Sequence, residues 1–171
     1  FIAWDHLFVR WGVWGFNPAY ITGADLFRLP VEEILFFIFI PYSCTFLYEV
    51  VRYFDRRKLL QPYVRPLTLG LAVSFLVVGV THGDKTYSAM VFLVSSAFLF
   101  AQLFLIRRDY LAHFYLMYFW SLLPFLVFNG VLTNGLPWID SGPIVWYNNA
   151  ENLAFRIMGI PIEDFVYSML L

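Results

Sequence analysis

Long apolar stretches, separated by short polar ones, dominate the chain. The stretches without Asp, Glu, Lys or Arg are residues 34–48, 66–81, 87–106 and 111–132. A helix needs roughly 20 mostly apolar residues to cross the hydrocarbon core of a membrane, and flanking residues can extend a shorter stretch. The pattern therefore predicts four membrane-spanning helices, with Pro41 and Pro124 as the positions where a helix would kink.

Two incomplete apolar segments lie at the ends of the sequence. Residues 160–171 begin a fifth span and then stop, and residues 1–4 have the character of the last turn of a helix. We therefore expect that both ends are trimmed, with one helix starting before residue 1 and another continuing after residue 171. The 171 residues as a whole are interpreted as a single membrane domain.

Composition supports a membrane protein and excludes several other classes. Of the 171 residues, 61% are hydrophobic and 13% are charged, with a mean hydropathy of +0.70, whereas a soluble domain usually has about 25% charged residues. A net charge of −1 excludes an electrostatic nucleic-acid binder. The single cysteine, Cys44, excludes an intramolecular disulfide framework. We expect an all-α, polytopic transmembrane helix bundle in the cell membrane.

The distribution of basic residues predicts the orientation of the chain. Seven of the 11 basic residues lie in two short connections, which the positive-inside rule places in the cytoplasm. The two long connections, about residues 5–29 and 133–159, then lie on the outer side and are expected to fold back over the helix ends. The seven residues are Arg52, Arg56, Arg57, Lys58, Arg65, Arg107 and Arg108.

The chain contains an internal repeat with an offset of 131 residues. Residues 16–34 align with residues 147–165, and both copies precede a span that enters the membrane from the same side, so the repeat is parallel. Repeat one covers about residues 1–52, repeat two about residues 111–171, and two spans at 66–106 join them. The matched pairs are Asn17 and Asn148, Ala19 and Ala150, Pro30 and Pro161, Glu32 and Glu163, and Glu33 and Asp164.

The doubled acids are the first candidates for chemistry. Carboxylates that enter an apolar span are costly unless they are paired, solvated or protonated, and they mark function by default. Neighbouring residues on a helix point about 100° apart, so only one acid of each pair can face the bundle interior squarely. Because Glu32 and Glu163 keep the same identity in both copies, we expect these two to face inward. Glu33 and Asp164 would then support them or face the outer loops.

Two carboxyl groups brought together in an apolar bundle cannot both ionise cheaply. One would stay protonated beside an ionised partner, and such a pair can give a proton and take one back without a metal or a redox cofactor. The alternative is an ordinary helix start, since proline suits the first turn and acids there complement the helix dipole. The repetition of the whole motif favours a site over that alternative.

Four sequence runs resemble a known family. Residues 11–20 (WGVWGFNPAY), 29–33 (LPVEE), 146–152 (WYNNAEN) and 160–164 (IPIED) resemble the lycopene cyclase domain family of carotenoid biosynthesis, the small membrane-embedded type in its single-chain form. The resemblance covers nearly the whole chain. Carotenoid cyclases of a different, soluble-domain type use a flavin and a Gly-x-Gly-x-x-Gly fingerprint, which this sequence lacks, so no flavin or other cofactor is expected.

The resemblance implies an acid-catalysed isomerisation of linear lycopene. An acid protonates the terminal C1=C2 double bond, the neighbouring alkene attacks the cation to close a six-membered ring, and a proton is lost. Loss from C6 gives a β-ionone ring and loss from C4 an ε ring; the expected product is β-carotene, formed through γ-carotene. By the same resemblance, the catalytic carboxylates are Glu32, Glu33, Glu163 and Asp164.

Aromatic and polar residues near the acids are candidates for binding and support. Aromatic faces stabilise a carbocation by roughly 0.5–2 kcal/mol each, and the candidates are Trp14, Phe16, Trp146 and Tyr147. Asn17, Asn148 and Asn149 would either hold the carboxyls or cap turns. Glu151 would pair with Arg156 or support Glu163, and Asp5 with His6 is a further supporting candidate. The three histidines are too widely spaced for a metal site.

Two other function classes remain as alternatives. A proton-coupled transporter would also have intramembrane acids and parallel repeats, but it would need polar residues through the depth of the bundle. A non-catalytic carotenoid-binding or assembly subunit would explain the aromatic residues but not the doubled acids. The expected partners are lycopene and membrane lipids, and both a homo-oligomer and contact with other carotenoid enzymes are open.

Overall fold

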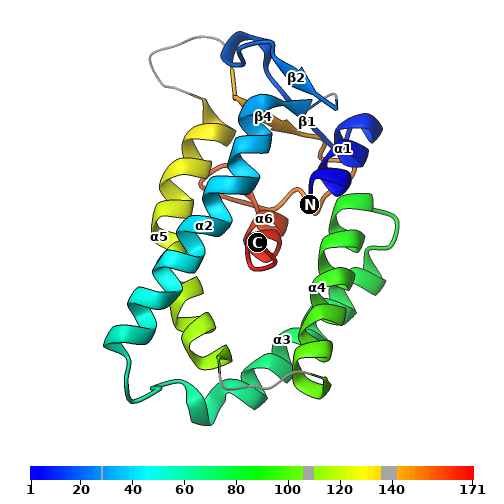
Figure 1. The fold of residues 1–171 in the computed structure, drawn as a ribbon. Helices are drawn as coiled ribbons and strands as arrows, with labels where there is room; N and C mark the ends of the chain where they lie inside the picture. Colours follow the sequence, from blue (N-terminus) through cyan, green and yellow to red (C-terminus); the bar gives the residue numbers. More distant parts are fainter. Residues whose placement is uncertain (28, 106–109, 136–141) are drawn as a thin grey trace.

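Helices make up most of the computed structural model, which describes residues 1–27, 29–105, 110–135 and 142–171. Four of the helices are long and two are short (Figure 1). The all-α prediction is confirmed. The long helices are α2 (Val31–Phe54), α3 (Val64–Thr81), α4 (Thr86–Phe104) and α5 (Leu111–Asn134), and the short ones are α1 (Ile2–Trp11) and α6 (Ile162–Ser168).

The four long helices are each long and apolar enough to cross a membrane, as the charge-free stretches predict. Helix α3 packs against α4, and α2 packs against α5, with α6 between these two pairs (Figure 1). The end of α2 lies at the same end of the bundle as the starts of α3 and α5. A short 3-10 turn, η2 (Gln61–Tyr63), precedes α3. Arg28, Arg107, Arg108 and Asp140 lie outside the described residues.

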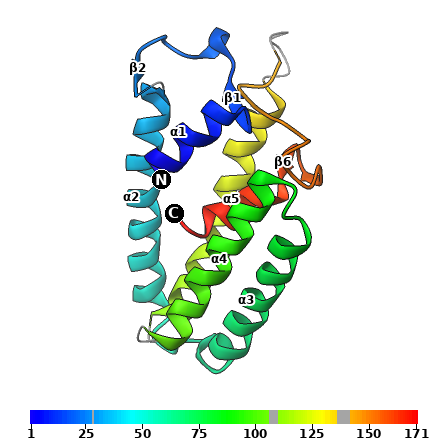
Figure 2. The same cartoon turned by 90° about the vertical axis from the view of Figure 1, so that its right-hand side faces the viewer.

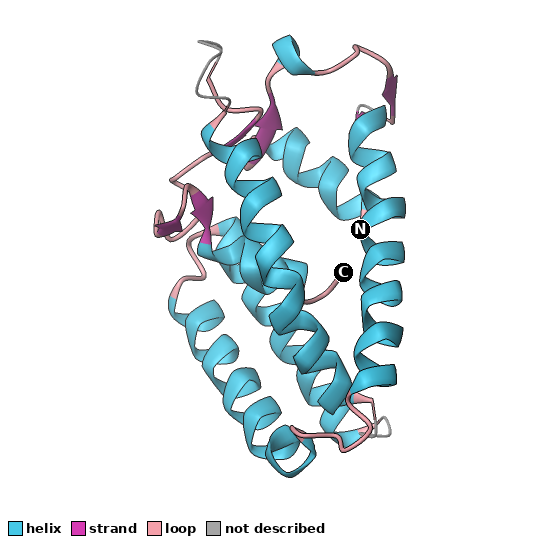
Figure 3. Ribbon diagram, turned by 90° about the vertical axis from the view of Figure 1, so that its left-hand side faces the viewer, coloured by secondary structure: helices cyan, strands magenta, loops and turns pink. Residues whose placement is uncertain are grey.

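The two long connections, which are predicted to lie on the outer side, pair with each other at one end of the helices. Strand β1 (Trp14–Phe16) runs antiparallel to β4 (Val145–Tyr147), with Trp14 opposite Tyr147 and Gly15 opposite Trp146. A side chain at Gly15 would collide with the Trp146 ring, so glycine permits this close approach. The strands gather toward one end of the long helices (Figure 3), which confirms that these connections fold back over the helix ends.

Helix α1 extends further than the sequence pattern predicts. It continues to Trp11, so the first outer connection begins at Gly12 and not at Asp5. Asp5 and Phe8 lie one turn apart on its buried face, and Gly12 ends the helix in the left-handed conformation, with φ of 71°. The helix therefore brings Asp5 into the interior instead of leaving it in a loop.

The backbone reproduces the 131-residue repeat. Strands β2 (Asp25–Leu26) and β3 (Leu29–Pro30) form a hairpin whose register is repeated by β5 (Arg156–Ile157) and β6 (Ile160–Pro161). In both copies the first helical N–H donates to a carbonyl seven residues earlier: Val31 to Ala24 at 2.9 Å and Ile162 to Phe155 at 3.0 Å. The internal parallel repeat is therefore present in the structure, while the outer limits of the two repeats stay a prediction. A short 3-10 turn, η1 (Pro18–Tyr20), precedes the first hairpin.

The buried core nearest the outer connections joins α1, β1, α4 and α6. Its apolar members are Phe8, Val13, Trp14, Tyr87, Val91, Phe92 and Val166. Three acids are also buried in this part of the molecule: Asp5 and Asp164 are 1% and 5% exposed, and Glu163 is fully buried. Buried carboxyls are rare unless they are paired or functional, so this end of the bundle is where a site is expected.

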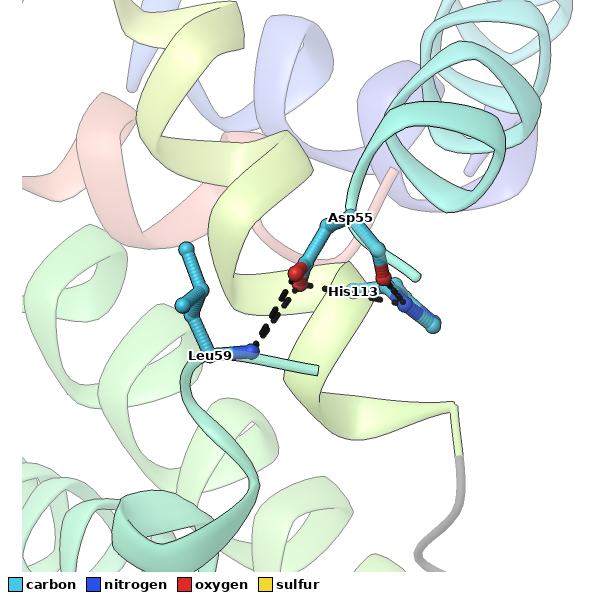
Figure 4. Close-up of polar contacts among 3 residues, drawn as sticks. All are labelled: Asp55, Leu59 and His113. Atoms are coloured by element: carbon cyan, nitrogen blue, oxygen red, sulfur yellow. Dashed lines mark hydrogen bonds and ion pairs between the residues drawn. The ribbon is translucent and has the colours of Figure 1, made fainter. Parts of the chain in front are cut away.

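A separate polar contact joins the C-terminal end of α2 to the N-terminal end of α5. The carboxylate of Asp55 accepts a hydrogen bond from the backbone N–H of Leu59 at 3.2 Å, and the Nε2 atom of His113 lies 2.9 Å from the Asp55 carbonyl oxygen (Figure 4). Both side chains are buried. This contact fixes the connection between α2 and α3 against the start of α5, far from Asp5, Glu163 and Asp164.

Candidate active site

Three carboxyl groups from three helices are close enough to interact electrostatically beneath the β1–β4 ribbon. They are Asp5 of α1, Glu33 of α2 and Asp164 of α6, which we call the acid cluster. The Glu33 carboxyl interacts electrostatically with both Asp5 and Asp164, and the interaction with Asp5 is the larger. Asp5 and Asp164 are buried and Glu33 is half-buried.

Aromatic contacts hold the helices that carry the cluster. The Phe1 ring stacks on Phe37 with centroids 6.1 Å apart and meets Tyr167 edge-on at 5.7 Å. Phe1 lies one turn before Asp5, and Phe37 one turn after Glu33. Residues four apart share a helix face, so each ring lies on the same side of its segment as the carboxyl one turn away. Figure 2 shows the start of α1 beside the upper part of α2.

Asp164 is surrounded by hydrogen-bond donors. The Tyr87 hydroxyl donates to its Oδ1 atom, and the Tyr147 hydroxyl donates to Oδ2 at 2.7 Å. The two phenol rings stack with centroids 6.1 Å apart. Hydrogen bonds to a charged carboxylate favour the ionised form, and here the two phenol donors oppose the effect of burial, which favours the neutral acid.

Asp5 has fewer partners. The Trp14 indole N–H donates to its Oδ1 atom at 3.0 Å, whereas the buried Oδ2 atom has no hydrogen-bond partner among the residues that the structure describes. The buried hydroxyl of Tyr167 is likewise unpaired within the described part of the chain. This hydroxyl interacts electrostatically with Asp5, Glu33 and Asp164, so it lies among the three carboxyls.

Glu32 and Glu163 hold the outer loops. Glu32 Oε1 accepts a hydrogen bond from the Thr22 backbone N–H at 2.8 Å, and Glu163 Oε1 accepts one from the Leu153 N–H at 2.7 Å. Each acid thus fastens the backbone ten residues before it. Glu163 also accepts a hydrogen bond from the Ser88 hydroxyl.

The arrangement differs in part from the expectation that Glu32 and Glu163 both face inward: Glu163 is fully buried, but Glu32 is only half-buried and bonds a loop N–H. Because each hairpin folds back over the start of its helix, the first acid of each pair lies beneath loop N–H groups. The second acid, about 100° further round the helix, points toward the cluster. Glu33 and Asp164 are therefore the two acids that the structure brings together.

The four candidate aromatic residues divide between the faces of the ribbon. Trp14 and Tyr147 lie opposite each other and donate hydrogen bonds to the acid cluster. Phe16 lies two residues beyond Trp14, on the same face of the ribbon, because side chains alternate along a strand. Trp146 lies on the opposite face, over Gly15, and is 43% exposed.

The candidate asparagines contact loop atoms. Asn17 and Asn148 make the same turn in the two repeats: each Oδ1 atom accepts a hydrogen bond at 3.0 Å from the backbone N–H two residues later. Asn149 accepts a hydrogen bond from Arg156 at 2.7 Å. The contacts of Asn17 and Asn148 match the turn-capping alternative, whereas Asn149 binds a side chain.

Glu151 positions the start of α4. Its Oε2 atom accepts a hydrogen bond from the Thr86 N–H at 3.1 Å, and its carbonyl accepts one from the Tyr87 N–H at 2.9 Å. Glu151 thereby places Tyr87 against Asp164. Arg156 contacts Asn149, and its guanidinium lies 5.6 Å from the centre of the Tyr147 ring.

Three residues of the site were missed by the sequence analysis: Tyr87, Ser88 and Tyr167. A sequence signal existed for the first two, because they are polar residues at the outer start of an otherwise apolar stretch. Tyr167 lies three residues after Asp164 and therefore shares its helix face. Without the acid as a reference, nothing distinguishes it from a lipid-facing tyrosine.

A largely apolar pocket of about 230 Å³ lies deeper in the bundle, between α2, α5 and residues 168–171. It begins near Pro41, which is eight residues beyond Glu33 and hence roughly 12 Å along the helix. The Tyr118 hydroxyl at its edge donates to the Phe165 carbonyl at 2.5 Å. Cys44 of α2 and Met117 of α5 also line it.

A family model described as lycopene cyclase matches residues 1–51 and 84–171. The matched segments contain every member of the acid cluster and both copies of the hairpin. Helix α3 and the connection before it fall between the matched segments.

Curated relatives with detectable similarity are fungal and much longer than this chain. The bifunctional lycopene cyclase/phytoene synthase of Arthroderma gypseum is 34% identical over 74 residues, which cover 41% of this chain and 12% of the relative. The protein of the same description from Aspergillus oryzae is 30% identical over 109 residues, covering 59% and 19%. The chain thus spans a fifth or less of the length of these relatives. No solved structure matches the chain.

Proposed function

The chain belongs to the lycopene cyclase family, and we propose that it is a lycopene β-cyclase that closes the ends of linear lycopene into β-ionone rings. The product forms through γ-carotene to β-carotene, and each ring closure is an isomerisation without net redox change. The names of the fungal relatives, each a bifunctional lycopene cyclase/phytoene synthase, support this substrate.

Glu33 is the proton donor in this proposal. Its proton moves to C2 of the terminal double bond, whose electron pair forms the new C–H bond and leaves a tertiary cation at C1. The neighbouring double bond supplies the pair that closes the ring, which moves the cation to the adjacent ring carbon. The support for this role is the position of Glu33 beside two other carboxyls, where a full set of negative charges would be costly.

Asp164 is the proton acceptor. It takes the proton from C6, and the released C–H pair forms the ring double bond, so the cation is discharged. Its two phenol donors, Tyr87 and Tyr147, favour the ionised form that this step requires. The contrast between the surroundings of Glu33 and Asp164 is the observation that carries the proposal.

The enclosure suits a carbocation and an apolar substrate. The rings of Trp14, Tyr87 and Tyr147 supply aromatic faces next to the acids. The β1–β4 ribbon covers this region from the outer side and would keep out water, which would otherwise trap the cation. The polyene chain would extend into the apolar cavity between α2 and α5.

Pigment analysis in a bacterial host that accumulates lycopene tests the proposal. The wild type should convert lycopene to γ- and β-carotene, and Glu33→Gln or Asp164→Asn should reduce conversion by at least about 100-fold, the scale of general acid–base catalysis. Glu49→Gln is the matched control, because Glu49 is exposed and pairs with Arg52 near the opposite end of α2. Unchanged lycopene beside abundant wild-type protein in the membrane would overturn the assignment.

A further inference from the structure

We propose that Asp5 and Glu33 act as a carboxyl pair across the contact between α1 and α2, and that this pair holds the proton which is delivered to the substrate. The inference rests on the proposed function and extends it to a residue outside the doubled acid motif. Asp5 acts through Glu33 and is therefore a positioning residue.

Geometry places the two carboxyls together. Phe1 and Phe37 stack between α1 and α2, and they flank Asp5 and Glu33 by one helical turn each. This stacking places Asp5 and Glu33, each one turn from its ring, on the sides of the two segments that approach each other. Among the charged groups around Glu33, Asp5 interacts with it most strongly.

The partners of Asp5 fit a shared proton. Asp5 is 1% exposed, and a single neutral donor, the Trp14 indole N–H, contacts its Oδ1 atom. Its Oδ2 atom is buried and has no partner in the described part of the chain. A fully charged carboxylate with one donor is expensive to bury. Two carboxyls that share one proton avoid that cost, because only one of them carries charge.

The proton balance closes over one ring closure. The pair gives one proton to C2 of the substrate and Asp164 takes one from C6, so the protein neither gains nor loses protons. For the next ring, the proton on Asp164 returns to the pair. The groups that face the pair from the packed elements are Asp164 and Tyr167 of α6, Tyr147 of β4 and Trp14 of β1.

A purely structural role for Asp5 makes a different prediction. If Asp5 only anchored Trp14, an amide would serve equally well, because its oxygen can accept the same indole N–H. Asp5→Asn removes the charge and the ability to share a proton, but keeps that acceptor. The substitution therefore separates the two roles.

The experiment measures lycopene conversion by membranes that contain the full chain, with apparent kcat and KM for wild type, Asp5→Asn, Asp5→Glu and Asp25→Asn. Asp25 is the matched control, because it lies exposed in the β2–β3 hairpin. We expect Asp5→Asn to lower kcat about tenfold or more with KM within about twofold of wild type. Asp5→Glu should recover a large part of the loss, and Asp25→Asn should behave as wild type.

Each outcome has a definite meaning. Wild-type kcat in Asp5→Asn would overturn the pair while leaving the cyclase assignment intact, whereas inactivity of the wild type would overturn the assignment itself. If Asp5→Asn fails to accumulate, Asp5→Glu and Trp14→Phe decide. In that case the kcat loss of Asp5→Glu is compared with that of Trp14→Phe. If Asp5→Glu loses less kcat than Trp14→Phe and keeps the thermal stability of wild type, the result supports the pair. If Asp5→Glu loses less kcat but also loses thermal stability, the anchoring of Trp14 matters more than the charge of Asp5.

Discussion

Glu33 and Asp164 occupy equivalent positions in the two repeats, yet only Asp164 accepts a hydrogen bond from a ribbon tyrosine. Tyr147 donates to Asp164 at 2.7 Å, and the position equivalent to Tyr147 in the first repeat is Phe16, which has no hydroxyl. Tyr87, the second donor to Asp164, comes from α4, which joins the two repeats. A duplicated framework thus carries two acids in unequal surroundings, as an acid and a base require.

Adding the missing hydroxyl should impair the proposed cyclisation. Phe16→Tyr places a donor at the position equivalent to Tyr147, and a hydrogen bond to Glu33 would favour its ionised form over the protonated form that the reaction needs. We expect kcat to fall about tenfold, the scale of one hydrogen bond to a charged group. Conversion of lycopene by isolated membranes measures this fall in kcat. Phe16→Leu is the control for altered packing, and an equal loss in both variants would contradict the explanation.

Removing a hydrogen-bond donor from Asp164 should impair its role as the proton acceptor. Tyr147→Phe removes one of the two phenol donors to Asp164 while keeping the ring that contacts Trp14 and Tyr87. We expect a kcat about tenfold lower, with little change in KM, because the aromatic surface remains. Tyr42→Phe is a suitable control, since Tyr42 is 72% exposed on α2. Wild-type kcat in Tyr147→Phe would exclude this hydrogen bond from the proton-accepting step.

The sequence identifies the repeat and the helices because these depend on local patterns. Charge-free stretches predict α3, α4 and α5 to within a few residues. The 131-residue alignment identifies the two equivalent segments, but it does not predict the hairpins that these segments form. Which acid faces inward depends instead on where each hairpin lies over its helix. A rotation of about 100° separates Glu32 from Glu33, and the 131-residue alignment treats both equally.

Contacts between distant elements are not visible in the sequence. Asp5 enters the acid cluster because α1 continues to Trp11 and because Phe1 stacks on Phe37. Tyr87 reaches Asp164 from a helix outside the repeat, 77 residues away in sequence. Both depend on how helices pack, which neither hydrophobic periodicity nor the alignment of the two repeats describes.

Glu32 and Glu163 should matter for stability more than for chemistry. Glu163→Ala removes the acceptor for Leu153 N–H and Ser88, and Glu32→Ala removes the acceptor for Thr22 N–H. We expect losses of about 1–3 kcal/mol, larger for Glu163 because it is fully buried. Thermal unfolding in detergent, followed by circular dichroism, measures the difference. A Glu32→Gln variant that keeps its Tm but loses cyclisation would instead return Glu32 to the catalytic acids.

The cavity between α2 and α5 should control access of the polyene. Cys44→Trp or Met117→Trp would fill part of the 230 Å³ that these residues line, while leaving the acid cluster unchanged. We expect KM for lycopene to rise about tenfold or conversion to be lost, because an apolar chain could no longer lie there. Phe46→Trp is the control, since Phe46 is 66% exposed on α2. Normal conversion by both cavity variants would place the substrate elsewhere.

Tyr167 should connect the base to the acid between ring closures. Its buried hydroxyl interacts with Asp5, Glu33 and Asp164 and has no hydrogen-bond partner among the described residues. A hydroxyl can accept a proton from a protonated Asp164 while it donates its own to the carboxyl pair, which would restore the starting state. Tyr167→Phe keeps the ring contacts with Phe1 and Trp4 and removes only this exchange.

The expected result is a slower second ring with a nearly normal first one. In a single-turnover experiment with excess protein, Tyr167→Phe should form γ-carotene at close to the wild-type rate, because Glu33 begins the cycle protonated. Under multiple turnover, its kcat should fall about tenfold and γ-carotene should accumulate over β-carotene. An equal loss in both regimes would mean that Tyr167 acts in the chemical step itself, and no loss in either would mean that the proton returns by another route.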